Sequence, residues 1–220
     1  AQGLMAGINA HLSINNKEAF VLKRNEAYIG VLIDDLITKG TEEPYRMFTS
    51  RAEYRTLLRQ DNADLRLTEI SHTLGLASQE SVRSVKKKRD QTSSFVSFLK
   101  KTSVKPEEIN PVLKQKKSSE IKQSVKLFKL FSRPNIALED ISKVQIVKDY
   151  LDHNHFNSGV LEQTVVQVKY SGYIEKEKIN AEKLNNLENI KIPTNFIYKK
   201  VKSLSSEAIQ KLEKIKPTSL

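Results

Sequence analysis

The longest helical pattern in the sequence spans residues 158–188, and it predicts a mainly α-helical chain. Apolar residues and one glycine recur there at helical intervals: Leu161, Val165, Val168, Gly172, Ile179, Leu184 and Leu187. Ser158 is expected to cap this helix. Gly172 lies between Tyr170 and Tyr173, where a residue without a side chain would let a second helix cross closely. A structural role in a central bundle helix is therefore favoured over a ligand-binding role for the two tyrosines.

Helix start and stop signals divide much of the remaining chain into further helices. Ser78 and Ser205 are expected N-caps, and Gly40 would end a helix. Pro106 is expected at a first helical position, whereas Pro111 would disrupt the same helix. The expected helices span residues 28–38, 62–67, 68–74, 79–101, 121–130, 144–151 and 205–215. Segment 28–38 is rich in β-branched residues, so a strand is the alternative there.

Small residues recur every three or four positions at the start of the chain. Gly3, Ala6, Gly7 and Ala10 would share one face of a helix, which lets that helix approach a sheet or a ligand closely. Close helix packing alone also accounts for this pattern. The chain starts inside this helical pattern and without a methionine.

Positive charge is concentrated in one stretch. The net charge is +11, and residues 82–133, the basic block, contain fifteen lysines and arginines against four acidic residues. Such a block is typical of a surface that binds a polyanion. Its alternative is a solvated surface that only maintains solubility. A membrane surface is the weaker interpretation, because the block has no tryptophan and no continuous apolar face.

The composition excludes several kinds of chemistry. The chain has no cysteine, so disulfides and thiolate catalysis are excluded. Its seven glycines form neither G-x-G-x-x-G nor a P-loop, so it cannot by itself hold a dinucleotide or a nucleoside triphosphate by those motifs. No apolar run approaches the roughly 20 residues that a membrane-spanning helix needs.

No catalytic set and no metal-ligand set stand out. The four histidines lie in unrelated contexts: His11, His72, His153 and His155. His153 and His155 are expected in an exposed loop, since no further Cys or His completes a metal site. Asp34 and Asp35 would diverge by about 100° on a helix, so we expect them to contact solvent or ion-pair partners.

Arginine, and no lysine, supplies the positive charge of residues 45–67. The five arginines are Arg46, Arg51, Arg55, Arg59 and Arg66. Arg51, Arg55 and Arg59 recur every four residues, so they would share one face of a helix. A guanidinium binds phosphate in a bidentate manner and stacks on bases. The alternative is an ion-paired helix neutralised by Glu53, Asp61 and Asp64, and spacing alone favours that alternative. Asp61 is also expected to cap the helix 62–67.

Three stretches occur in the order and spacing of a known family. They are Gly3-Leu-Met-Ala-Gly-Ile-Asn-Ala10, then Tyr45-Arg-Met-Phe-Thr-Ser-Arg-Ala-Glu-Tyr-Arg-Thr-Leu-Leu-Arg-Gln-Asp-Asn-Ala-Asp-Leu-Arg-Leu67, and Val168-Lys-Tyr-Ser-Gly-Tyr-Ile174 with Leu187-Glu-Asn-Ile-Lys-Ile-Pro193 behind it. On these motifs the chain resembles the tRNA uridine 5-carboxymethylaminomethyl modification enzymes, MnmG, also called GidA. The resemblance extends along the whole chain and is looser in residues 85–145.

The resemblance implies an activity for the full-length protein. It would be a cytoplasmic homodimer that uses FAD and NADH. Together with a GTPase partner, MnmE, and a folate one-carbon donor, it would modify carbon 5 of the wobble uridine in certain tRNAs. This chain would be the C-terminal part, a multi-helix bundle that follows the last helix of a missing FAD-binding α/β domain. Alone, it is expected to be inactive, to bind no cofactor and to contact no membrane.

The resemblance also implies roles for segments and residues. Residues 1–20 would be the terminal helix of the flavin-binding domain, 21–75 a helical connecting region and 76–220 the C-terminal helical domain. Gly3 and Gly7 would lie near FAD. The expected tRNA contacts are Arg46, Arg51, Arg55, Arg59, Arg66, Lys23 and Arg24. The basic block would extend this surface, and the helices 158–188 and 205–215 would dock the partner.

Two other classes of function are alternatives. One is a non-enzymatic, basic helical RNA-binding module that resembles the enzyme only in structure. The other is a protein-protein adaptor whose arginines form internal ion pairs. Ligand binding that depends little on salt would favour the adaptor.

Overall fold

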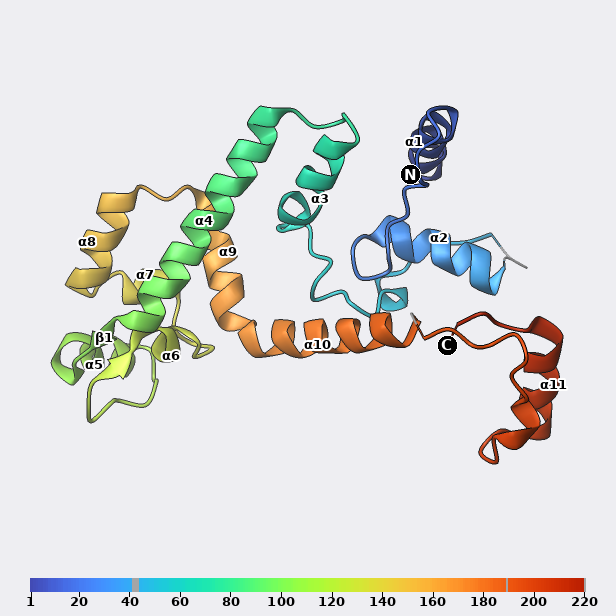
Figure 1. The fold of residues 1–220 in the computed structure, drawn as a ribbon. Helices are drawn as coiled ribbons and strands as arrows, with labels where there is room; N and C mark the ends of the chain where they lie inside the picture. Colours follow the sequence, from blue (N-terminus) through green and yellow to red (C-terminus); the bar gives the residue numbers. More distant parts are fainter. Residues whose placement is uncertain (41–43, 189, 220) are drawn as a thin grey trace. The chain divides into compact units, whose positions relative to one another are not determined.

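The computed structural model describes residues 1–40, 44–188 and 190–219, and it is mainly helical (Figure 1). The chain divides into two compact units, Ala1–Ile174 and Glu175–Leu220, which are described separately below. The expected fold class, mainly α with a multi-helix bundle, is confirmed. The expected division at residues 20 and 75 stays a prediction.

Most helices of the first unit agree with the sequence signals. The unit contains α1 (Gln2–Ile14), α2 (Tyr28–Lys39), the 3-10 turn η1 (Thr49–Arg51), α3 (Ala63–Thr73), α4 (Gln79–Lys101), α5 (Pro106–Gln115), α6 (Leu127–Phe131), α7 (Leu138–Ile141), α8 (Gln145–Asn154) and α9 (Ser158–Lys169). α10 (Ser171–Glu188) begins in this unit and continues into the second. Segment 28–38 is therefore a helix and not a strand, and Gly40 follows it with φ +68°.

Helix α4 is the central element of the first unit, and it packs against α3, α6 and α9 (Figure 1). Ser78 caps it as predicted, because its hydroxyl oxygen accepts a hydrogen bond from the Ser81 amide at 3.1 Å. Glu80 in the first turn and lysines in the last turn favour the same helix through its dipole. Phe95 and Leu99 are completely buried on its inner face.

The core of the first unit lies at the C-terminal half of α4. Residues from α4 through α9 contribute to one cluster, with Leu113, Leu127 and Phe131 fully buried. The rings of Phe95 and Phe156 stack with their centroids 5.3 Å apart, beside a second stacked pair from α4 and α8. Complete burial of a side chain of this size stabilises a fold by roughly 1.5–3 kcal/mol.

Three local expectations for this unit were wrong. Residues 121–130 do not form one helix: β2 (Val125–Lys126) pairs antiparallel with β1 (Ser103–Val104), and α6 begins only at Leu127. Pro111 does not disrupt α5, which continues to Gln115. The helices predicted at 62–67 and 68–74 are the single helix α3. In the first case, pairing with a distant strand outweighs the local helical signal.

The predicted helix 158–188 is interrupted at Tyr170. The Ser171 hydroxyl donates to the Val168 carbonyl at 3.2 Å, a side-chain bond that competes with the backbone ladder. Lys169 secures the end of α9, because its ammonium donates to the carbonyls of Arg133 and Ile136. Burial lowers the pKa of Lys169. α9 and α10 are therefore separate helices, and the cap of α9 is the residue before the predicted Ser158.

The second unit contains the later part of α10, the 3-10 turn η2 (Tyr198–Lys200) and α11 (Ser206–Ile215). Ser205 caps α11 as predicted, with its hydroxyl 3.2 Å from the Ala208 amide. The Phe196 and Tyr198 rings meet edge to face, and η2 packs on α11.

Gly30→Ala is expected to destabilise the protein. A Cβ atom at position 30 would lie 2.3 Å from the carbonyl oxygen of Lys23 and 2.5 Å from that of Leu22. Both oxygens belong to the backbone and cannot rotate away. We expect a loss of about 1–3 kcal/mol in the free energy of unfolding, measured by urea denaturation.

The matched control is Gly172→Ala in α10. In the described part of the chain no atom lies within 4 Å of the added Cβ, so this change should be neutral or slightly stabilising. Equal unfolding free energies for the two variants would contradict the steric argument.

Asp140→Asn is expected to remove a pH-dependent part of the stability. Burial alone would raise the pKa of Asp140, but the Ala137 amide and the Lys116 ammonium outweigh it and hold the pKa below its ordinary value of 3.8. A lowered pKa stabilises the fold above pH 3.8, and this contribution is lost as the pH falls through the folded-state pKa. The variant should lose about 1–3 kcal/mol at pH 7.

Urea unfolding of both proteins across a pH series tests this expectation. The difference between wild type and variant should shrink below about pH 4. A difference that stays constant down to strongly acidic pH would mean that the carboxylate charge does not matter.

A candidate nucleic-acid interface

The arginine segment does not form the predicted helix. Apart from η1, residues 45–62 run through turns and extended backbone, so Arg51, Arg55 and Arg59 do not share a helical face. Long-range contacts hold the segment instead. Tyr54 and Leu58 are buried, and Leu58 packs in a small cluster with Val31 of α2. The four-residue spacing of Arg51, Arg55 and Arg59 therefore does not indicate a helix here.

Arg24 links this segment to α2 through three carboxylates. Its guanidinium lies 2.8 Å from both Asp34 and Asp35 and 2.7 Å from Glu53. Burial alone would lower the pKa of Arg24, but the hydrogen bonds to Glu53, Asp35 and Asp34 outweigh it and hold the pKa above its ordinary value. The expected ion-pair role of the two aspartates is confirmed. That Arg24 also contacts tRNA stays a prediction.

Asp35 is buried and gathers two further groups from the arginine segment. It accepts a hydrogen bond from the Tyr45 hydroxyl at 2.9 Å, and Arg51 lies 3.7 Å away. The Arg51 guanidinium also lies 5.0 Å from the centroid of the Tyr45 ring. Burial and the bond to Asp35 raise the pKa of Tyr45. Arg51 thus stands at the edge of this cluster with its side chain 41% exposed.

Arg59 lies in the turn that follows and Arg66 lies on α3, and both are engaged in bonds within the protein. Arg59 pairs with Asp61 at 3.1 Å and donates to the Thr56 carbonyl at 2.5 Å. Arg66 donates to the Asn62 side chain at 2.9 Å, and to the carbonyls of Arg59 and Glu26. Burial, and then repulsion by Arg59, lowers the pKa of Arg66. These two arginines stabilise the turn, as the ion-pair alternative predicted for part of the segment.

Asp61 ties the turn to α4 and α9. The Gln163 amide of α9 donates to both the carbonyl and the carboxylate of Asp61, and the Lys88 ammonium of α4 lies 3.2 Å from the same carbonyl. Lys88 also pairs with Asp64 at 2.9 Å. Burial alone would raise the pKa of Asp61, but Arg59 and Gln163 outweigh it and lower the pKa. Asp61 therefore acts as a tertiary anchor and not as the predicted helix cap.

Arg46, Arg51 and Arg55 are the exposed arginines of the segment, and Arg51 is the one of the three that faces a carboxylate, Asp35. The structure records no hydrogen bond or ion pair for Arg55 among the described residues. Arg46 lies over the Phe48 ring, 5.3 Å from its centroid. Lys23 is exposed as well. These side chains have the accessibility that a phosphate contact requires.

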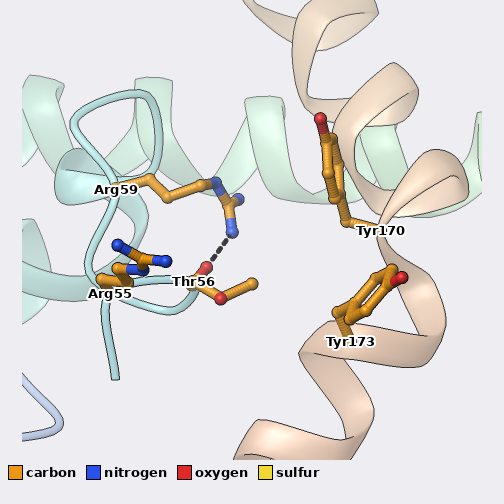
Figure 2. A pocket seen from close by; sticks show the side chains of 5 residues that line it. All are labelled: Arg55, Thr56, Arg59, Tyr170 and Tyr173. Atoms are coloured by element: carbon orange, nitrogen blue, oxygen red, sulfur yellow. Dashed lines mark hydrogen bonds between the residues drawn. The ribbon is translucent and has the colours of Figure 1, made fainter. Parts of the chain in front are cut away.

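A pocket of about 440 Å³ opens beside Arg55, within the first unit. Arg55, Thr56 and Arg59 line one side, and Tyr170 and Tyr173 line the other (Figure 2). Tyr170 is 52% exposed and Tyr173 is 71% exposed. Apart from chain neighbours and the backbone of the same helix, no atom of the described chain lies within 4 Å of where a Cβ on Gly172 would stand. Their exposure does not support the structural role that was favoured for the two tyrosines, and among the described residues no second helix crosses at Gly172. Two tyrosines three residues apart in a polar helix are a signal that the sequence analysis interpreted as structural.

The basic block is largely at the surface. Lys88 and Arg89 pair with α3, and Lys116 pairs with Asp140. The block's exposed side chains include Arg83, Lys86, Lys87, Lys101, Lys105, Lys114, Lys117, Lys122 and Lys129. Most of the block's charge is therefore accessible to a polyanion.

Gly3 and Gly7 are open positions on α1. Apart from chain neighbours and the backbone of the same helix, no atom of the described chain lies within 4 Å of where a Cβ on either glycine would stand. The placement of Gly3 and Gly7 near FAD stays a prediction.

Two further features are absent from the described residues. No group of three or more His, Cys, Asp or Glu is placed to hold a metal ion. None of the described helices combines the length and the apolar character needed to cross a bilayer. His153 and His155 are exposed as expected, but His153 lies in the last turn of α8 and not in a loop.

Two family models match adjacent parts of the chain. Residues 79–178 match the C-terminal helical domain of the tRNA modifying enzyme MnmG/GidA, and residues 180–220 match the C-terminal helical bundle of the same enzyme. The boundary between the models lies close to that between the two compact units.

Relatives and solved structures agree with these models. The tRNA uridine 5-carboxymethylaminomethyl modification enzyme MnmG of Christiangramia forsetii is 62% identical over 100% of this chain and 35% of its own length. MnmG of Flavobacterium johnsoniae is 61% identical over 96% of this chain and 34% of its own. Aquifex aeolicus GidA is 38% identical with a TM-score of 0.71, over 99% of this chain and 33% of that one. The chain thus spans about a third of the length of these relatives, and it belongs to the MnmG/GidA family of tRNA-modifying enzymes.

Proposed function

We propose that this chain is the part of an MnmG-type enzyme that holds tRNA. The observation that carries this proposal is the open guanidinium of Arg55, presented at a pocket by a turn whose other arginines are held in place. A phosphate prefers a guanidinium that no internal carboxylate occupies, because a planar fork can then bind two oxygens. Arg46, Arg51 and Lys23 lie in or near the same segment and supply further contacts.

The remaining arginines of the predicted set act mainly by shaping the surface. Arg24, Arg59 and Arg66 donate to carboxylates and carbonyls within the protein. They stabilise the irregular conformation of the segment, because without them backbone carbonyls and carboxylates would lack hydrogen-bond donors. Any contact they make with tRNA uses the donors left over from these bonds.

The basic block supplies long-range attraction. Its exposed lysines on α4 and on the segments that follow attract the phosphate backbone without reading its sequence. Binding would then release counterions and weaken steeply as salt is added.

The longer protein would carry the chemistry. We propose that it is a cytoplasmic homodimer that uses FAD and NADH. With a GTPase partner of the MnmE type, it would install 5-carboxymethylaminomethyl on the wobble uridine, and this chain alone would be inactive. The names of the relatives support the modification itself. The partner would dock on α10 and α11, and a GTPase pull-down that survives deletion of residues 203–220 would count against α11.

Arg55→Ala is expected to weaken tRNA binding without loss of stability. A hydrogen bond to a charged group contributes about 1.5–3 kcal/mol, so the dissociation constant should rise at least about tenfold. The slope of log affinity against log salt should become shallower by about one. Titration of the chain with tRNA at several salt concentrations measures both, and thermal unfolding verifies the fold.

Two other variants distinguish a specific Arg55 contact from a general effect of charge and from a loss of stability. Lys214→Ala removes one exposed charge from α11, and its tRNA affinity should stay near that of the wild type. Arg66→Ala should lower the melting temperature, because carbonyls that Arg66 now satisfies lose their donor. If Arg55→Ala behaves like Lys214→Ala, or melts like Arg66→Ala, then Arg55 is not a phosphate contact.

A further inference from the structure

We propose that the pocket between Arg55 and the two tyrosines receives one unstacked nucleotide from a single-stranded segment of RNA. This inference rests on the proposed function, since it specifies the form of RNA that the surface takes. The base would stack on Tyr170 or Tyr173, and its phosphate would contact Arg55. These residues come from segments more than a hundred positions apart in the sequence, and they line one cavity (Figure 2).

The tyrosines present open aromatic faces. Their exposed fractions of 52% and 71% are unusual for side chains that stabilise a fold chiefly by burial. Within the described residues, neither ring contacts another aromatic ring, whereas Tyr150 stacks on Phe98 and Tyr198 meets Phe196 edge to face. An open ring at the rim of a pocket is the usual platform for a nucleic-acid base, because every base has a π face.

The opposite wall of the pocket carries two arginines, of which Arg55 is exposed and Arg59 is held by bonds within the protein. Arg59 is held by Asp61 and by the Thr56 carbonyl, so it shapes the wall. Arg55 is exposed, and its donors are available for a phosphate. The volume of about 440 Å³ lies in the range of about 300–1,000 Å³ that ligand pockets occupy. Positive charge facing aromatic rings favours a nucleotide over an apolar peptide.

The frame around the pocket is fixed by bonds already described. Gln163 ties α9, and through it the start of α10, to the turn that carries Arg55. The break at Ser171 sets the direction in which the two tyrosines leave the end of α9. A pocket with fixed walls selects a base that is already free of its neighbours. In an A-form duplex the bases stay stacked, whereas bases in loops can be splayed out.

The test compares a short, fluorescently labelled single-stranded RNA with the duplex that it forms with its complement. Fluorescence anisotropy titrations would use the 220-residue chain, the double variant Tyr170→Ala/Tyr173→Ala and the double variant Tyr170→Phe/Tyr173→Phe. Ile179→Ala, a half-exposed apolar residue on α10 outside the pocket, is the control. Size-exclusion chromatography and thermal unfolding of each variant accompany the titrations.

The expected result is specific to the single strand. The alanine variant should bind it at least about fivefold more weakly, while the phenylalanine variant and Ile179→Ala stay near the wild type and duplex binding is unchanged. If both RNAs bind and the alanine variant loses neither, this inference fails and the proposed function stands. If wild type binds neither RNA, both fail. If the alanine variant changes its oligomeric state but binds RNA unchanged, the pocket is a protein contact. If it loses affinity equally for both RNAs and has a lower melting temperature, the tyrosines are structural. Either result overturns the inference.

Discussion

The geometry of the interface depends on the anchoring of Asp61. This single residue holds Arg59 through its carboxylate, Gln163 of α9 through its carbonyl and carboxylate, and Lys88 of α4 through its carbonyl. Three segments that are distant in sequence therefore meet at one point. The turn has no regular ladder of backbone hydrogen bonds, so its shape depends on this anchor. Because donors from three residues converge on the carbonyl and the carboxylate of Asp61, the position of the turn follows from the position of the helices.

The arginines divide into two classes for a physical reason. Arg24 lies where three carboxylates converge, and a buried carboxylate such as Asp35 needs a cationic partner to offset its desolvation. Arg66, on α3, donates to the carbonyls of Arg59 and Glu26, two residues that lie outside the helices. Arg55 has neither task, which leaves its charge available. A cluster of arginines in a sequence thus contains both structural and binding residues, and only their partners distinguish them.

Sequence reasoning succeeded where structure is decided locally. The caps at Ser78 and Ser205 and the start at Pro106 each depend on residues within one helical turn, and all three were predicted. It failed where distant segments decide, as in the turn around Arg55. There the four-residue spacing competed with burial of Leu58 and with the bond from Gln163. The exposure of Tyr170 could not be predicted either, because the break after α9 depends on where the Lys169 ammonium finds its acceptors.

Lys169 also has a mechanical consequence. Its backbone ends α9 directly before Tyr170, while its side chain is fastened to the carbonyls of Arg133 and Ile136 and lies over the Phe131 ring. The tyrosine wall is thereby coupled to the loop that follows α6, a segment that does not line the pocket. A shift of that loop, whatever its origin, would be transmitted through one side chain to the orientation of the aromatic rings. The coupling is direct, since Lys169 and Tyr170 are neighbours in the chain.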